Sequence, residues 1–317
     1  MISTTRRGLL AMMAGGGWMA AAQQAASAKR VKSLKITLLT TMLAERGIGE
    51  WGFAALVEVD GRRILFDTGA RPDTLLINTK ELGISLDGIR QVVLSHNHGD
   101  HTVGLASVRA QLAGAQVHVG KGIFYSRPGR DGAEGNFLLK NQAQLRQSVK
   151  FVEHDKPAEL APGVWLTGPV PRKYPERNFP GTGRMVTPEG IQDDNVPEDS
   201  SLVFDTDQGL VVLSGCGHAG IANTLEYSRT IVRPDAPVHA AIGGWHLFQL
   251  DQEKLAWTAG KMRECGVKNF LGAHCTGLEA VYKIRELNRM ARENCVVGAV
   301  GASFDLAKGI APGMIAR

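Results

Sequence analysis

The segment at residues 95–101, SHNHGDH, constrains this chain more than any other part of its sequence. It places three histidines and one aspartate within six residues, directly after a short apolar stretch at 92–94. His96 and His98 are two positions apart, so on extended backbone their side chains leave on the same side and can bind one ion. The pattern therefore predicts a metal centre at the end of a buried strand.

The second half of this segment predicts another ion beside the first. Gly99 gives the backbone the freedom to turn, and after that turn Asp100 and His101 can reach an adjacent ion. Several imidazoles with a carboxylate suit Zn²⁺, Fe or Mn²⁺ rather than Ca²⁺. The alternative is a solvated polar loop, which would be typical of a single His-x-His in a turn. The complete HxHxDH pattern after an apolar strand favours the metal centre.

The rest of the sequence predicts one α/β domain over residues 29–317. Strand candidates at 34–39, 53–59 and 63–66 precede the motif, and an Asp60-Gly61 turn joins the last two. A helix is expected at 103–112, directly after the motif. A second hairpin is expected at 201–214, followed by helices at 223–232, 252–264 and 278–293. Strand-rich halves that each end in helices predict an αββα sandwich, with two mixed β-sheets face to face and helices outside.

Residues 121–200 interrupt this regular pattern. They are rich in glycine, proline and charged residues, and we expect a loop-rich insertion around one or two strands. The nearby His118 and His154 have no ligand partner close in sequence, so we expect them to be structural or at the surface.

Residues 1–28 have the pattern of a cleavable export signal. The pair Arg6-Arg7 precedes an apolar stretch at 9–22, and Ala26-Ser27-Ala28 offers small residues for cleavage after Ala28. The stretch is too short and glycine-rich for a stable membrane span. We therefore expect a periplasmic protein exported by the twin-arginine route, with a plain Sec signal or a short anchor helix as the alternatives.

The charge pattern favours a small molecule over nucleic acid as the partner. The formal net charge is only +5, and no dense basic run carries interleaved aromatic residues. A scattered group of basic residues could hold an anionic substrate or simply form a solvated face: Arg127, Arg130, Arg172, Lys173 and Arg177.

The four cysteines fall into two pairs. Cys216 and Cys275 lie inside histidine-containing motifs, so we interpret them first as site residues. Cys265 and Cys295 either form a disulfide bridge or remain two buried thiols.

The motif SHNHGDH, with FDTG at 66–69, resembles the signature of the metallo-β-lactamase superfamily. The C-terminal half resembles the dihydropterin-synthase-like branch of that superfamily. The matching segments are EDSSL at 198–202, GLVVLSGCGHAGIAN at 209–223, IGGWHL at 242–247 and AHCTG at 273–277. This resemblance covers nearly all of residues 34–305, implies the αββα sandwich, and says little about the substrate.

The resemblance also implies a set of metal ligands. His96 and His98 would bind the first ion, while Asp100 and His101 would bind the second ion together with the late residue His274.

Two further residues of the GCGH segment complete this expected set. Cys216 stands where most members carry a bridging aspartate, and its softer thiolate would favour Zn²⁺. His218 projects to the same side two residues later and could replace a missing histidine of the first site.

Two other residues have an expected role and an alternative. His246 would face the pocket as a substrate-binding or acid/base group, or else it is a structural histidine beside a Gly-Gly turn. Asp67 would orient a ligand histidine, or else it is only a turn residue at a strand end.

These assignments predict an enzyme with two divalent ions that hydrolyses a small polar or phosphorylated molecule, or carries out a related displacement. Asp100 would orient the nucleophile and His246 would handle the proton of the leaving group. A dihydropterin-type synthase activity is a further option that the resemblance implies. The alternatives are a metal-binding sensor with little turnover and a di-iron redox enzyme.

Overall fold

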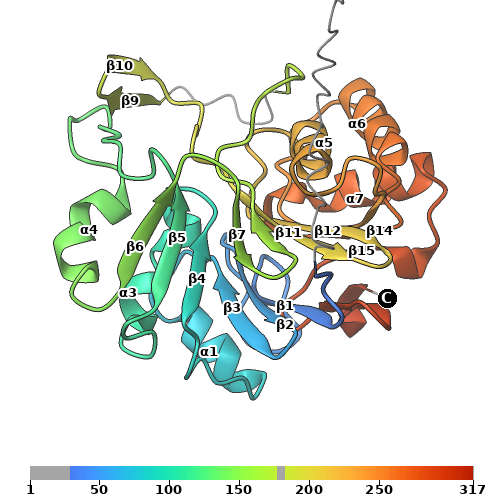
Figure 1. The fold of residues 1–317 in the computed structure, drawn as a ribbon, viewed down its shortest axis with the longest axis horizontal. Helices are drawn as coiled ribbons and strands as arrows, with labels where there is room; N and C mark the ends of the chain where they lie inside the picture. Colours follow the sequence, from blue (N-terminus) through green and yellow to red (C-terminus); the bar gives the residue numbers. More distant parts are fainter. Residues whose placement is uncertain (1–28, 177–182, 317) are drawn as a thin grey trace, which may run out of the picture.

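Two β-sheets pack face to face, and helices cover the outer face of each in the computed structural model (Figure 1). The structure describes residues 29–176 and 183–316. The expected export signal at 1–28 and the basic residue Arg177 lie outside these ranges. The αββα sandwich expected from the sequence is confirmed.

The first sheet has eight strands in the order β17-β16-β1-β2-β3-β4-β5-β6, with β3 to β6 parallel to one another. Three helices, α1, α3 and α4, pack on its outer face, and the short α2 carries part of the 95–101 motif. The strands are β1 (Leu34–Thr40), β2 (Ala54–Val59), β3 (Arg62–Phe66), β4 (Gln91–Leu94), β5 (Gln116–Gly120), β6 (Lys150–His154), β16 (Ser303–Asp305) and β17 (Gly309–Ala311). The helices are α1 (Thr74–Glu81), α2 (Gly99–Thr102), α3 (Leu105–Val108) and α4 (Phe137–Leu145).

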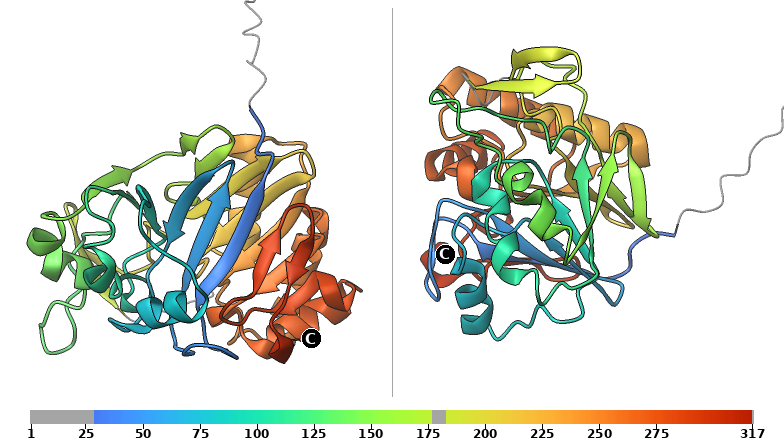
Figure 2. Two further views of the ribbon diagram at one scale, coloured as in Figure 1. Left: turned by 90° about the horizontal axis from the view of Figure 1, so that it is seen from below. Right: turned by 90° about the vertical axis from the view of Figure 1, so that its left-hand side faces the viewer.

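The second sheet has seven strands in the order β15-β14-β13-β12-β11-β8-β7, and helices α5, α6 and α7 pack on its outer face. The strands are β7 (Ala158–Ala161), β8 (Val164–Leu166), β11 (Ser201–Thr206), β12 (Gly209–Ser214), β13 (Val238–Gly243), β14 (Asn269–Gly272) and β15 (Cys295–Val297). The helices are α5 (Ile221–Val232), α6 (Gln252–Glu264) and α7 (Leu278–Leu287). A separate hairpin of β9 (Arg184–Thr187) and β10 (Gly190–Asp193) lies apart from both sheets (Figure 2). Three short 3₁₀ turns are η1 (His274–Thr276), η2 (Arg292–Asn294) and η3 (Met314–Ala316).

The central strands are apolar on both faces because each face is covered. In β12, Val211 and Leu213 point into the core between the sheets, whereas Leu210 and Val212 pack toward the outer helices. All six residues of this strand are buried. Because both faces are buried, the sequence GLVVLS is a nearly continuous apolar run.

The segment 121–200 is more regular than the sequence suggested. It contains five strands and α4 rather than one or two strands in long loops, and β6, β7 and β8 belong to the two main sheets. The edge strand β6 is only partly buried along its length, so it lacks the continuous apolar run that would have marked it.

Two expected helices are shorter than predicted. The helix expected at 278–293 ends at Leu287, and Arg289 shortly after adopts a left-handed backbone with φ of 50°. The helix expected at 103–112 is a single turn, α3 (Leu105–Val108), that continues as turns. Among the residues that the structure describes, no helix is both long and apolar enough to cross a membrane.

Candidate metal centre

The residues singled out by the sequence come together where several strands of both sheets end. The motif at 95–101 follows β4 of the first sheet. Cys216 and His218 follow β12, His246 follows β13, and His274 follows β14 of the second sheet. Because β12, β13 and β14 are parallel, their carboxyl ends present these loops at one edge.

A first group of ligand atoms is formed by His96, His218 and Cys216, which all lie within 4.8 Å of one another. The Nε2 atoms of His96 and His218 are 3.2 Å apart. The ring of His98 lies 4.6 Å from that of His96 and 4.9 Å from that of His218. Three imidazoles that converge from two sheets in this way have the arrangement of ligands around one ion.

Burial keeps these imidazoles in the form that binds metal. It lowers the pKa of His96 and of His218 well below the usual value, and neighbouring histidines lower both further. It also lowers the pKa of His98 to about 4. Neutral histidine is the species that coordinates a cation, so this group is ready to bind metal at neutral pH.

A second group consists of His101, His274 and Cys216, whose ligand atoms also lie within 4.8 Å of one another. The Oδ2 atom of Asp100 is 3.3 Å from Nε2 of His274 and 3.8 Å from Nε2 of His101. Burial raises the pKa of Asp100, but the two histidines outweigh this effect and lower it, so the side chain is a carboxylate at neutral pH. Cys216 belongs to both groups and therefore lies between them.

Asp67 fixes the orientation of His101, as expected from the sequence. Its Oδ2 atom is 2.7 Å from Nδ1 of His101 and accepts a hydrogen bond from the Ser95 hydroxyl, while its Oδ1 atom accepts the Ser95 N–H. This contact leaves Nε2 of His101 to face Cys216 at 3.1 Å. Burial lowers the pKa of His101, but the carboxylates of Asp100 and Asp67 outweigh it and raise the pKa to about 9. The surroundings thus favour positive charge here, which a metal ion would also supply.

Cys275 connects the metal-ligand groups to His246. Its Sγ atom lies 3.3 Å from Sγ of Cys216 and accepts the backbone N–H of His246 at 3.2 Å. The ring of His246 lies 4.9 Å from that of His218 and lines the same pocket. Both histidines that flank this contact, His246 and His274, have left-handed backbones with φ of 48° and 49°. Such strained conformations cluster at functional sites.

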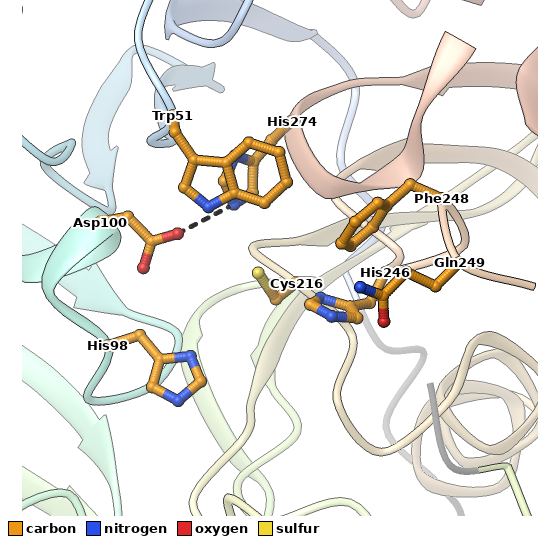
Figure 3. Close-up of a pocket in the computed structure, with 8 residues that line it drawn as sticks. All are labelled: Trp51, His98, Asp100, Cys216, His246, Phe248, Gln249 and His274. Atoms are coloured by element: carbon orange, nitrogen blue, oxygen red, sulfur yellow. Dashed lines mark ion pairs between the residues drawn. The ribbon is translucent and has the colours of Figure 1, made fainter. Parts of the chain in front are cut away.

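The pocket over these residues has a volume of about 490 Å³. Figure 3 shows its side chains, which come from loops after β1, β4, β12, β13 and β14. The sequence did not indicate three of them, Trp51, Phe248 and Gln249. The lining residues are Trp51, His98, Asp100, Cys216, His246, Phe248, Gln249 and His274.

The basic residues that could have held an anionic substrate mostly have internal partners. Arg127 is buried and pairs with Asp194 and Glu198 at 2.8 Å each. Arg172 donates to the backbone oxygen of His218 at 3.1 Å. None of the four basic residues that the structure describes lines the pocket.

Lys173 and Arg130 lie at the surface. Lys173 is exposed and pairs with Glu226 at 2.8 Å, and Arg130 is exposed. Together with the ion pairs of Arg127 and the backbone hydrogen bond of the exposed Arg172, this leaves the described members of the basic group in structural or solvated positions.

Two acidic residues of the EDSSL segment support the loops that carry ligands. Glu198 accepts the backbone N–H of Asn97 at 3.2 Å, next to His96 and His98. Asp199 accepts the N–H of Ala219 at 2.8 Å, next to His218. Burial raises the pKa of Asp199 to about 6. These carboxylates hold the loops, and neither is in the pocket lining.

The remaining histidines and cysteines lie away from the pocket. His118 on β5 and His154 on β6 face each other, with Nδ1 and Nε2 3.0 Å apart. Cys265 and Cys295 are buried free thiols, so the disulfide alternative for this pair is wrong for this structure.

Comparisons with known proteins agree with this geometry. The model of the family described as "Metallo-beta-lactamase superfamily" matches residues 52–236. The chain is 30% identical over 273 residues to 7,8-dihydropterin-6-methyl-4-(β-D-ribofuranosyl)-aminobenzene-5′-phosphate synthase of Methanocaldococcus jannaschii, an alignment that covers 79% of this chain and 90% of the relative.

Two solved structures share the fold. One is described as a metal-dependent hydrolase of the β-lactamase superfamily; it has a TM-score of 0.71 and 24% identity and covers 85% of this chain and 98% of its own. The other is a diphosphatase from the PhnP family, with a TM-score of 0.51 and 15% identity, covering 87% of this chain and 98% of its own.

Proposed function

Since this chain belongs to the metallo-β-lactamase superfamily, we propose that it is an exported hydrolase that holds two divalent metal ions, of which Zn²⁺ fits best. Its reaction is the hydrolysis of a small polar molecule, or a related displacement at a carbonyl or phosphoryl centre. The observation that carries this proposal is the position of Cys216, whose Sγ atom lies within 4.8 Å of ligand atoms in both histidine groups.

The donor set fits zinc. His96 and His218 offer neutral imidazoles at one group, with the His98 ring beside both, and His101 and His274 offer imidazoles at the other. Imidazole and thiolate are ligands that suit zinc, whereas a calcium site would need mostly oxygen atoms. The thiol of Cys216 between the groups favours Zn²⁺ over the harder Mn²⁺.

Bound at these residues, divalent ions would polarise the scissile carbonyl or phosphoryl group and make a water molecule acidic enough to react near neutral pH. Asp100 is a carboxylate at the pocket wall and can accept a hydrogen bond from the attacking water, which orients it. His246 lines the wall on the Cys216 side and can donate a proton to the leaving group. Asp100 would thus orient the water, and His246 would protonate the leaving group.

The test uses the chain without residues 1–28, loaded with zinc. We expect two zinc ions per chain and measurable turnover on a panel of phosphoesters, lactones and β-lactams. The variant His98→Ala should lose metal and activity together, because it removes a ligand of the first group. The control variant His154→Ala alters a histidine outside the pocket and should keep both.

Three results would contradict parts of the proposal. Two metals per chain without turnover on any substrate would support a binding or sensing role instead. Iron in the native protein with a visible absorption band would support the redox alternative. Full metal content in His98→Ala would overturn the ligand assignment.

A further inference from the structure

We propose that the pocket binds an uncharged aromatic ring of the substrate, and that Trp51 and Phe248 form the contact surface for that ring. This inference deepens the proposed function, since the ring would be attached to the group that reacts at the metal ligands. It names a substrate class, aryl or heteroaryl compounds without a charged substituent on the ring.

The first observation is that two large aromatic side chains at the pocket are open to solvent. Trp51 is 47% exposed and Phe248 is 43% exposed, although both line the cavity above the metal ligands. Their ring centroids are 5.4 Å apart in an edge-to-face arrangement. Apolar surface left open inside a concave site is typical of a surface that a ligand covers.

The second observation is that both rings are held in place before any ligand arrives. Trp51 packs on His274 with centroids 5.0 Å apart, and Phe248 packs on His246 at 5.2 Å. Figure 3 shows the two rings beside these histidines. Rings fixed in this way lose little side-chain entropy when a ligand binds.

The backbones of both loops are also tightly packed. At Gly52, next to Trp51, a Cβ atom would lie 2.7 Å from the backbone nitrogen of Ala70 and 2.9 Å from the backbone oxygen of Asp100. At Gly277 a Cβ atom would lie 2.7 Å from Cβ of Phe248. These close approaches hold each aromatic side chain at a set distance from the metal ligands.

The third observation concerns charge. Among the residues that the structure describes, the pocket lining includes no lysine or arginine, and its only neutral amide is Gln249. Arg127 is paired with the carboxylates of Asp194 and Glu198, and Arg172 is exposed outside the lining and donates to the backbone oxygen of His218. A phosphate or sulfate on the far end of the substrate would therefore lose water without gaining a cationic partner. An uncharged ring is better suited to this surface.

The experiment compares two hydroxamates on the zinc-loaded chain. Acetohydroxamate and benzohydroxamate share the same metal-binding group, so the ratio of their dissociation constants isolates the contribution of the ring. We expect benzohydroxamate to bind about tenfold more tightly, as aromatic contacts and ring burial predict. Trp51→Ala and Phe248→Ala should each reduce this ratio several-fold, while Trp51→Phe should largely preserve it.

Trp257→Ala is the matched control, because Trp257 is similarly exposed at 40% and packs on Tyr174 instead of the pocket. It should leave the ratio unchanged. Equal affinity for the two hydroxamates in the unmodified chain, or a ratio that neither alanine variant lowers, would overturn the aromatic site. Tighter binding of benzohydroxamate that carries a para-phosphonate would overturn the preference for an uncharged ring.

This measurement separates the inference from the proposed function, because hydroxamate binding requires metal but no turnover. If the chain shows the expected affinity ratio but hydrolyses no substrate, the aromatic site is supported and the proposed hydrolase activity is contradicted. A zinc-loaded chain that binds neither hydroxamate contradicts both.

Discussion

The Sγ atom of Cys216 lies 3.1 Å from Nε2 of His101. Asp67 contacts Nδ1 on the other side of the same ring and so orients Nε2 toward the sulfur. A thiol therefore occupies the position between two groups of histidines. The sequence resemblance places a bridging aspartate at this point in most relatives. A sulfur atom at this position would give a metal ion bound here spectroscopic properties that can be measured directly.

The first prediction concerns this sulfur. The cobalt-substituted protein should show a sulfur-to-metal charge-transfer band, and Cys216→Asp should abolish the band while it keeps two metals per chain, because a carboxylate can take the same position. Cys216→Ala should weaken metal binding by about a hundredfold or more, since a lost ligand costs at least as much as a lost supporting contact. Cys295→Ala alters a buried thiol away from the pocket and should keep the band. A band that persists in Cys216→Asp but disappears in Cys275→Ala would show that Cys275 is the sulfur ligand instead, since its Sγ atom lies 3.3 Å from that of Cys216.

The second prediction concerns Asp67. Asp67→Asn should weaken metal binding by about 10–100-fold, because His101 loses the charged partner that orients it. Asparagine tolerates the left-handed backbone at this position, where φ is 54°. Asp60→Asn is the control, since Asp60 is also an aspartate with positive φ (44°) but lies in a hairpin turn. Metal titration of both variants decides the matter, and equal affinities in the two would count against the role of Asp67.

The third prediction separates His246 from the ligands. His246→Gln should lower kcat by about 10²–10⁴-fold, the usual contribution of a general acid, with metal content unchanged. Loss of metal in this variant would instead make His246 a ligand, as its closeness to Cys216 and Cys275 allows. Metal analysis beside steady-state kinetics distinguishes the two roles.

The fourth prediction concerns pH and stability. Burial, together with the neighbouring His154, lowers the pKa of His118 to about 4. An unfolded chain takes up a proton at this histidine below about pH 6.5, whereas the folded chain does so only near pH 4. The stabilisation is therefore present above pH 6.5 and is lost as the pH falls from 6.5 toward 4. The loss of unfolding free energy is about 2 kcal/mol. This is less than the full pKa shift would give, because water reaches part of the His118–His154 pair.

Urea unfolding of the metal-free protein at pH 7 and pH 4.5 tests whether the unfolding free energy falls with pH as expected. His118→Gln should show a smaller loss of unfolding free energy between the two pH values than the unmodified protein. Both proteins retain the same pocket histidines, so the difference between them reports the His118–His154 pair rather than the pocket. An equal or larger loss in the variant would contradict the assignment.

The fifth prediction concerns export. We propose that residues 1–28 direct the chain to the periplasm by the twin-arginine route, and Arg6→Lys with Arg7→Lys should then leave the protein in the cytoplasm. Cell fractionation measures this outcome. Mature double variant in the periplasm would argue for another route.

Local spacing explains which parts of the site the sequence could predict. His96, His98, Asp100 and His101 lie within six residues, and His218 follows Cys216 by two, so their shared direction follows from short-range backbone geometry. The strands on both sides of the sandwich were visible for a similar reason, as apolar runs such as 209–214.

Long-range contacts explain what the sequence could not predict. Arg127 resembles a surface cation until its partners Asp194 and Glu198, 67 and 71 residues later, are placed beside it. The role of Trp51 and Phe248 depends on two separate loops that meet only in the fold. The strands β16 and β17 have three residues each, too few for a periodic pattern to identify them.

The division of the metal ligands between the two sheets has a consequence for how the protein matures. The first sheet on its own could present only the ligands of the 95–101 segment, whereas Cys216, His218 and His274 arrive with the second. If these residues bind metal as proposed, high-affinity uptake would therefore require that both sheets have docked. A metal ion bound at these residues would link the two sheets, and its uptake during refolding would then report the last step of assembly.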